Sequence, residues 1–165
     1  MGCLLLVFCM GFFYKQTHRL EYSLPTINYI LVEKRQRKMT IFHNNLPIKS
    51  YKIALGAQPI GPKRQEGDNK TPEGLYKIIS KNDKSKFHLS LKISYPNKND
   101  TQYALTQKMA CGGELMIHGV GKGFEWLGKL HAFFDWTKGC IAVSNAEIEE
   151  IYNSTPIGTP IEIRP

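Results

Sequence analysis

Cys140 and His118 are the two side chains whose types and surroundings predict chemistry. Cys140 follows Gly139 and precedes the apolar run 141–143, so it lies where a loop meets a strand. A glycine next to a thiol gives a substrate room to approach and leaves backbone N–H groups free to face an oxyanion. His118 ends another predicted strand and is followed by Gly119. The pair fits a nucleophile with its general base, the arrangement that lets a cysteine attack an acyl carbon.

Other roles are open for the same residues. Lys138, and the helix start predicted four residues after Cys140, would favour a thiolate, whereas an isolated cysteine is more often a buried structural residue. His118, His131 and Cys140 lack the short paired spacing of structural zinc ligands, so we expect no metal site. A disulfide between Cys111 and Cys140 would need an oxidising compartment and would remove the nucleophile.

The elements that must position these residues are mostly strands. Residues 87–94 alternate apolar and polar side chains with a period of 2 over eight positions. Shorter extended runs are expected near 29–31, 39–41, 51–55, 115–118 and 157–163, with a turn at 43–45 after the second of them. Ser144 with Glu147 three residues later fits a capping box and predicts a helix, and residues 56–74 have the composition of a loop. We therefore expect a mainly β single domain with one or two short helices.

The composition limits the class of protein. The chain has 165 residues, 42% of them apolar, which suits one domain with its own core rather than two domains or a disordered chain. The net charge is +8, but no dense basic stripe with interleaved aromatics occurs, so we expect no nucleic-acid partner. Two of the four cysteines lie in an apolar N-terminal run, which leaves too few for a disulfide framework.

The N-terminal run predicts export. Gly2 to Tyr14 are 13 residues without a charge, within the length range of a signal-peptide core. No basic residue precedes the run and no small-x-small cleavage site follows it, since the first alanine is Ala54. Lys15 and Arg19 behind the run favour the opposite membrane orientation. We expect residues 1–20 to be a signal or an uncleaved membrane anchor, and the protein to lie in the periplasm or cell envelope.

An ordered set of motifs spans the rest of the chain and is far more specific than a lone His-Gly or Gly-Cys pair. The motifs are Ala54-Leu55-Gly56, Gly61-x-Lys63, Gly67-Asp68, Thr71-Pro72-Glu73-Gly74-x-Tyr76, Tyr95-Pro96-Asn97 with Asp100, Ile117-His118-Gly119, Asp135 to Asn145, and Gly158-Thr159-Pro160. Together they resemble the L,D-transpeptidase catalytic domain, a YkuD-like domain of peptidoglycan-modifying cysteine enzymes. The resemblance extends over about residues 27–165.

The resemblance implies a β-sandwich-like fold with the cysteine in a cleft and chemistry on peptidoglycan stem peptides. By position it implies that Cys140 is the nucleophile and His118 the general base, with the backbone carbonyl of Gly119 orienting the imidazole. The amides of Gly139 and Cys140 would form the oxyanion hole. The implied substrate-binding residues are Trp136, Thr137 and Lys138.

Two positions depart from the family pattern. Lys138 stands where many members have His or Asn. Ala142 stands where many have Arg, which removes an expected carboxylate contact beside the nucleophile. Lys63 or Arg64 could supply that charge, although we expect an exposed, solvated Lys-Arg pair at these positions.

The expected reaction is acyl transfer without a metal or an organic cofactor. Cys140 attacks the third-residue carbonyl of a tetrapeptide stem, D-alanine leaves, and an acceptor amine takes the acyl group, forming a cross-link or attaching a protein to the wall. With water as acceptor the same residues make a hydrolase: an L,D-carboxypeptidase, or an amidase that releases a wall-attached lipoprotein. A non-catalytic wall-binding module is the remaining alternative.

Overall fold

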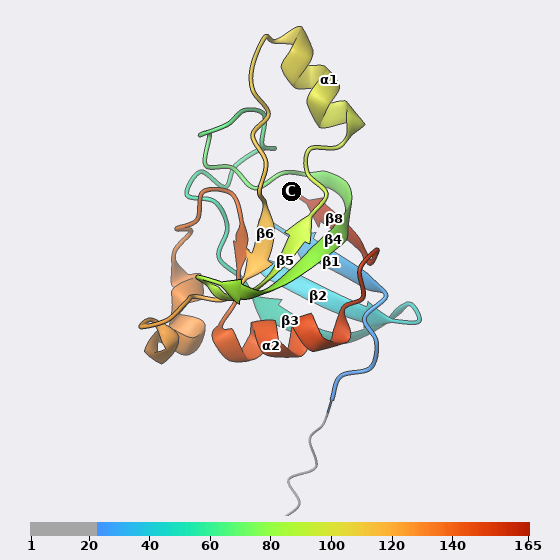
Figure 1. The fold of residues 1–165 in the computed structure, drawn as a ribbon, viewed down its shortest axis with the longest axis vertical. Coiled ribbons are helices and arrows are strands. Elements are labelled where there is room, and N and C mark those ends of the chain that lie inside the picture. The colour runs from blue at the N-terminus through green and yellow to red at the C-terminus, as the bar shows by residue number, and fades with distance from the viewer. Residues whose placement is uncertain (1–22) are drawn as a thin grey trace, which may run out of the picture.

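The computed structural model describes residues 23–165. In chain order its elements are β1 (Tyr29–Glu33), β2 (Lys38–His43), β3 (Leu46–Lys52), β4 (Gly74–Ser85), β5 (His88–Ile93), α1 (Lys98–Thr106), β6 (Met116–His118), the 3-10 helix η1 (Glu125–Phe133), β7 (Ile141–Ala142), α2 (Asn145–Ser154) and β8 (Pro160–Arg164). The eight strands form one mixed sheet in the order β3-β2-β1-β8-β4-β5-β6-β7 (Figure 1). β1 pairs in parallel with β8 and β6 with β7, while the other neighbours are antiparallel.

Short turns set the register of the first three strands. Asn44 and Asn45, with φ of 49° and 64°, join β2 to β3. Two successive residues with positive φ are what a two-residue hairpin turn requires, and asparagine adopts this conformation more readily than other non-glycine residues. The turn predicted at 43–45 is confirmed, and β2 and β3 pair on either side of it.

The sheet is curled, and the long strand β4 pairs with strands of both of its halves. The first residues of β4, from Gly74 to Lys77, pair with β8, and the rest of the strand pairs with β5. Two register shifts interrupt the β4–β5 pairing, and such irregularities bend and twist a strand. The buried side chains of both halves join one core, which includes Ile41 of β2, Ile93 of β5 and Ile117 of β6.

The two ends of the strand order also meet. Beyond β3 the chain crosses to β7, where the backbones of Ala54 and Ala142 exchange hydrogen bonds of 3.0 and 2.9 Å. A second bridge joins Gly56 to Thr137. The mainly β fold is confirmed, and the layers of the expected sandwich are the two halves of a single curled sheet.

The predicted capping box begins α2. The Ser144 side chain accepts a hydrogen bond from the Glu147 N–H, and the Glu147 carboxylate accepts from the Ser144 N–H at 3.0 Å and from its hydroxyl at 2.7 Å. Ile148 and Ile151 are fully buried on the inner face of the helix. This helix prediction is confirmed, and it puts the N-cap of α2 four residues beyond Cys140.

Three elements went unpredicted. β4 is mostly polar, and α1 buries only Ala104, so neither has the apolar periodicity by which elements are recognised. η1 has a non-helical kink at Gly128, with φ of 47°, and most of its large apolar side chains are exposed. Residues 23–165 therefore contain two α-helices and a 3-10 helix, where one or two helices were expected.

The N-terminal predictions lie outside the described residues, because the uncharged run Gly2–Tyr14 precedes residue 23. Within residues 23–165, no helix combines the length and the apolar character that crossing a bilayer requires.

Candidate active site

The parallel pairing of β6 with β7 brings His118 and Cys140 to one face of the sheet. The register places Ile117 beside Ile141 and His118 beside Ala142. Cys140 immediately precedes β7 and continues this register opposite Met116. Because side chains alternate between faces, His118 and Cys140 point the same way, two residues apart along adjacent strands. Strand spacing and rise put their Cα atoms on the order of 8 Å apart, a distance that an imidazole and a thiol together can span.

Cys140 is a partly buried thiol. Its Sγ lies 3.8 Å from the Glu114 carbonyl oxygen. Burial raises the pKa of Cys140 above its ordinary value, while the Met116 N–H and the charge of Lys63 act in the opposite direction. Burial therefore opposes the thiolate that Lys138 and the start of α2 were expected to favour, and a nearby base would help the thiol to react.

His118 is the buried imidazole of the site. Its Nδ1 lies 2.6 Å from the Gly119 carbonyl oxygen, and since a carbonyl only accepts, Nδ1 carries the proton. The lone pair is then on Nε2. Burial lowers the pKa of His118, so its neutral form dominates. Phe87 stacks on the imidazole at 4.4 Å and Trp136 meets its edge at 5.8 Å between ring centroids, which fixes the ring plane.

The loop before the nucleophile is held by Thr137. The Thr137 hydroxyl donates to the Cys140 carbonyl at 2.7 Å and accepts from the Gly139 N–H at 3.1 Å. The Gly139 N–H is thus engaged with a side chain, which differs from the free oxyanion donor expected from the sequence. Gly139 has φ of 124°, and a Cβ there would lie 2.6 Å from the Lys70 carbonyl oxygen, so the turn requires glycine.

The segment 54–57 forms backbone hydrogen bonds with the loop that precedes Cys140. The Thr137 N–H donates to the Leu55 carbonyl at 3.1 Å, and the Ala57 N–H donates to the Thr137 carbonyl at 2.9 Å. A Cβ on Gly56 would lie 3.0 Å from the Gly139 Cα. The two glycines let two backbones pass at close contact, which accounts for the Ala54-Leu55-Gly56 motif.

A buried ion pair lies close to the thiol. The Lys63 ammonium is 2.8 Å from the Asp68 carboxylate, and both side chains are more than nine-tenths buried. Burial acts to raise the pKa of Asp68, but the bonds from Lys63 and three backbone N–H groups outweigh it and hold this pKa below its ordinary value. The expectation of an exposed pair is wrong for Lys63, whereas Arg64 is exposed and its guanidinium lies over the Tyr103 ring.

The alternatives for the cysteines and histidines can be compared with these positions. Cys111 and Cys140 are both free thiols, and the Cys111 Sγ donates to the Asp100 carbonyl at 3.2 Å. Among residues 23–165, no group of three or more His, Cys, Asp or Glu side chains is arranged to hold a metal ion. His131 is buried, and neither of its ring nitrogens has a hydrogen-bond partner in the described part of the chain.

A known protein family matches most of this chain. The profile of the L,D-transpeptidase catalytic domain, YkuD, matches residues 27–163. The chain belongs to this family. Escherichia coli YafK, provisionally named an L,D-transpeptidase, is 28% identical over 130 residues, which are 75% of this chain and 45% of YafK.

Solved structures agree on the fold. Pgp2 of Campylobacter jejuni, a helical cell shape determining protein, has a TM-score of 0.65 and 23% identity over 87% of this chain and 49% of Pgp2. An L,D-transpeptidase of Mycobacterium tuberculosis has a TM-score of 0.54 and 17% identity over 86% of this chain and 58% of that one. The chain thus spans about half the length of YafK and Pgp2.

The two departures from the L,D-transpeptidase pattern have different surroundings. Ala142 is fully buried between His118 on β6 and Ala54 beyond β3, so a methyl group fills this position. Lys138 is exposed beside the nucleophile. In this L,D-transpeptidase domain Lys138 is thus two residues from the nucleophile in the chain, and the charge of the buried Lys63 acts on the thiol.

An apolar groove of about 680 Å³ begins beside the imidazole. Phe87 and Trp136, the two rings that contact His118, form its inner end, and His131 lies in its wall. The remaining lining comes from Val120 and the η1 region, namely Phe124, Leu127, Leu130, Phe133 and Phe134.

The sequence analysis missed the contact of Phe87 with His118 and the Lys63–Asp68 ion pair. The available signal for the pair was that Lys63 and Asp68 both stand close to glycines in the motif set.

Proposed function

We propose that this chain is a cysteine-dependent acyltransferase that forms a thioester with a peptidoglycan stem tetrapeptide and transfers it to an amine. Members of its family are L,D-transpeptidases, which act on peptidoglycan peptides. The observation that carries the proposal is the placement of His118 and Cys140 on one face of β6 and β7, with Nδ1 held by Gly119.

The first half-reaction is acylation. His118 Nε2 takes the proton of the Cys140 thiol, and the thiolate attacks the carbonyl of the diamino-acid residue at position three of the stem. The Cys140 N–H faces the developing oxyanion, joined by the Gly139 N–H once its bond to Thr137 lengthens. The tetrahedral species collapses, the bond to D-alanine breaks, and the protonated His118 gives its proton to the leaving amine.

The second half-reaction is transfer. An acceptor amine attacks the thioester, His118 takes its proton, and the proton returns to the Cys140 sulfur as the new amide forms. Trp136 and Thr137 shape the wall and floor of the cleft, and we assign the exposed ammonium of Lys138 to the donor's terminal carboxylate. The family resemblance to Pgp2, a protein named for helical cell shape, supports a role in wall architecture at the periplasmic or cell-envelope side.

Intact-protein mass spectrometry tests acylation. The wild-type protein incubated with a stem tetrapeptide or a carbapenem should gain a covalent adduct that maps to Cys140. Cys140→Ala should gain none, and Cys111→Ser, the matched change at the other described thiol, should acylate normally. A wild-type protein that never acylates would refute the enzyme and leave a wall-binding module.

Product analysis separates the acceptors. With purified muropeptides, a dimer linked through the third residues of two stems supports amine transfer. A tripeptide monomer as the sole product would show that water is the acceptor and that the protein is a carboxypeptidase. Release of a lipoprotein fragment from wall sacculi would instead show an amidase that detaches wall-bound lipoprotein.

A further inference from the structure

An exposed aromatic ridge stands on the η1 region. It consists of Phe124, Trp126, Leu130, Phe133 and Phe134, whose side chains are 56% to 77% exposed. Single exposed apolar residues are common on protein surfaces, but five large ones within eleven residues are unusual, and four of them line one groove. Such a concentration of exposed apolar side chains is typical of an interaction surface.

Inward-facing side chains of η1 attach the ridge to the domain. His131 is buried and Leu127 is partly buried, so these two side chains fasten η1 to the domain. The kink at Gly128 and contacts with α2 set the direction of the two halves of η1. Leu127 and His131 thus anchor the segment, and four of the five ridge side chains also line the apolar groove beside His118.

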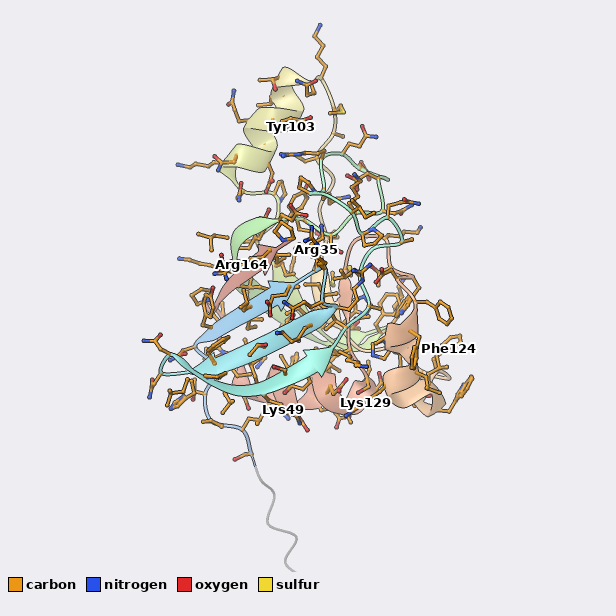
Figure 2. All side chains as sticks on the ribbon, turned by 180° about the vertical axis from the view of Figure 1, so that it is seen from behind. Arg35, Lys49, Tyr103, Phe124, Lys129 and Arg164 are labelled. Carbon is orange, nitrogen blue, oxygen red and sulfur yellow. The ribbon has the colours of Figure 1, made fainter. Side chains whose placement is uncertain are left out.

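The charges around the ridge are mostly positive. Lys122 and Lys129 are exposed and form no ion pair among residues 23–165, and Lys86 lies over the Phe87 ring at the inner end of the groove. Glu125 is the one acidic residue between 120 and 134, and its carboxylate accepts a hydrogen bond from the Gly123 N–H. Figure 2 shows Phe124 and Lys129 together at one corner of the molecule, away from Tyr103 on α1.

Exposed aromatic and aliphatic side chains flanked by lysines suit the boundary between lipid headgroups and acyl chains. The lysines complement an anionic lipid surface. The described chain begins by the far end of α2: Ser154, at the end of α2, donates to the Leu24 carbonyl, and the other end of α2 adjoins η1 (Figure 1). The residues before Leu24 include the uncharged run Gly2–Tyr14.

We propose that the aromatic ridge inserts into the headgroup region of an anionic lipid bilayer and holds the catalytic domain against the membrane. This contact is separate from any N-terminal anchor, because it is made by η1 within the domain. It also does not depend on the acyl-transfer proposal, since neither Cys140 nor His118 takes part in it.

The position of Trp126 relative to lipid tests the proposal. The chain has two tryptophans, so Trp136→Phe leaves Trp126 as its single tryptophan reporter. With the full-length protein and vesicles of phosphatidylglycerol and phosphatidylcholine, the Trp126 emission should shift to the blue and be quenched by brominated acyl chains. The matched variant Trp126→Phe, which reports on Trp136 in the groove, should be quenched several-fold less. The double variant Lys122→Gln with Lys129→Gln should lower the affinity for these vesicles, measured from the Trp126 emission, about tenfold.

Two fluorescence results would overturn the proposal. Trp126 could keep the emission of a water-exposed indole while the protein sediments with vesicles, which would show attachment through the N-terminal run alone. A blue shift that grows with protein concentration without vesicles would show that a second copy covers the ridge. If Trp136→Phe does not fold, hydrogen exchange of the wild-type protein serves instead. Residues 122–134 should gain protection on adding vesicles, and unchanged exchange there would refute the proposal.

Discussion

Burial favours the neutral forms of both Cys140 and His118. It raises the pKa of the thiol from an ordinary value of 9.0 and lowers that of the imidazole from 6.5. Burial therefore disfavours a thiolate–imidazolium pair and favours the neutral thiol and the neutral imidazole. In this arrangement His118 must accept the thiol proton as the bond to carbon forms, so its pKa controls the lower limit of activity.

The pH dependence of Cys140 reactivity follows from these directions. As pH falls through the pKa of His118, the imidazole becomes protonated and the rate of Cys140 reaction drops. Because that pKa lies below 6.5, the rate stays at its maximum down to a lower pH than an exposed histidine would allow. In His118→Gln the base is absent, so the rate should rise about tenfold per pH unit up to the raised pKa of the thiol. Alkylation by iodoacetamide, followed peptide by peptide with mass spectrometry, measures both profiles. Identical profiles would contradict the role of His118.

The Lys63–Asp68 pair connects stability with the nucleophile. Lys63→Met should lower the free energy of unfolding by about 2 kcal/mol or more, because it leaves the Asp68 carboxylate buried without its cation. It should also raise the pKa of Cys140 further, since the charge of Lys63 lowers that pKa. Urea titration and the alkylation profile measure the two effects. Arg64→Gln, at an exposed neighbour, is the control and should change the unfolding free energy by less than about 0.5 kcal/mol. Equal effects of the two variants would contradict the assignment.

At the scale of elements, the site depends on where short strands stop. β6 ends at His118 and β7 starts just after Cys140, so the two reactive side chains lie at the ends of paired strands rather than within them. Both strands are buried in the curled sheet, and α2 begins directly after β7 with its own capping box. The nucleophile therefore lies directly before a two-residue strand, and the start of α2 follows that strand closely.

The two capping boxes should differ in their effect on stability. Ser144→Ala should lower the unfolding free energy by about 1–2 kcal/mol, because the buried Glu147 carboxylate loses its hydroxyl partner as well as the helix losing its cap. Asn97→Ala removes the same motif from α1, which buries only Ala104, and should cost less than about 1 kcal/mol. Thermal or urea unfolding measures both. A larger loss in Asn97→Ala would show that α1 contributes more to the cooperative unit than its burial indicates.

At the scale of the whole molecule, closure of the sheet positions the site. The bridges from 54–57 to β7 and Thr137 hold the nucleophile loop against the far end of the strand order. Gly56 lies at this closure, packed against both Asn69 and Gly139. The two ends of the strand order thus meet at the loop of Cys140, so the site depends on the closed sheet and not on one local segment.

Gly56→Ala should disturb this closure. Its Cβ would lie 2.2 Å from the Asn69 carbonyl oxygen, a backbone atom that cannot move alone, so we expect a loss of about 3 kcal/mol in unfolding free energy and slower acylation of Cys140. Gly113→Ala is the matched control, because no atom lies within 4 Å of its Cβ, and it should be within about 0.5 kcal/mol of wild type. Unfolding titrations and adduct formation check both. A Gly56→Ala protein with wild-type stability would show that the closure yields readily.

Strand periodicity and motif order predicted much of this protein. Alternation over 87–94 predicted β5, the Ser144–Glu147 spacing predicted α2, and the Asn44-Asn45 pair predicted the hairpin turn. These signals are local, because a period of 2, a cap and a positive-φ turn each involve only neighbours in the chain. β4, α1 and η1 escaped the same reasoning because their apolar side chains are few or face outward.

The sequence by itself determined the mainly β class, the family and the candidate pair Cys140 and His118. Only the tertiary structure decided the charge state of that pair, the burial of Lys63 against Asp68, and the engagement of the Gly139 N–H with Thr137. The physical reason is that residue type and spacing identify what a side chain can do. Its pKa and its free hydrogen-bond donors depend on solvent exclusion and on partners contributed by distant parts of the chain.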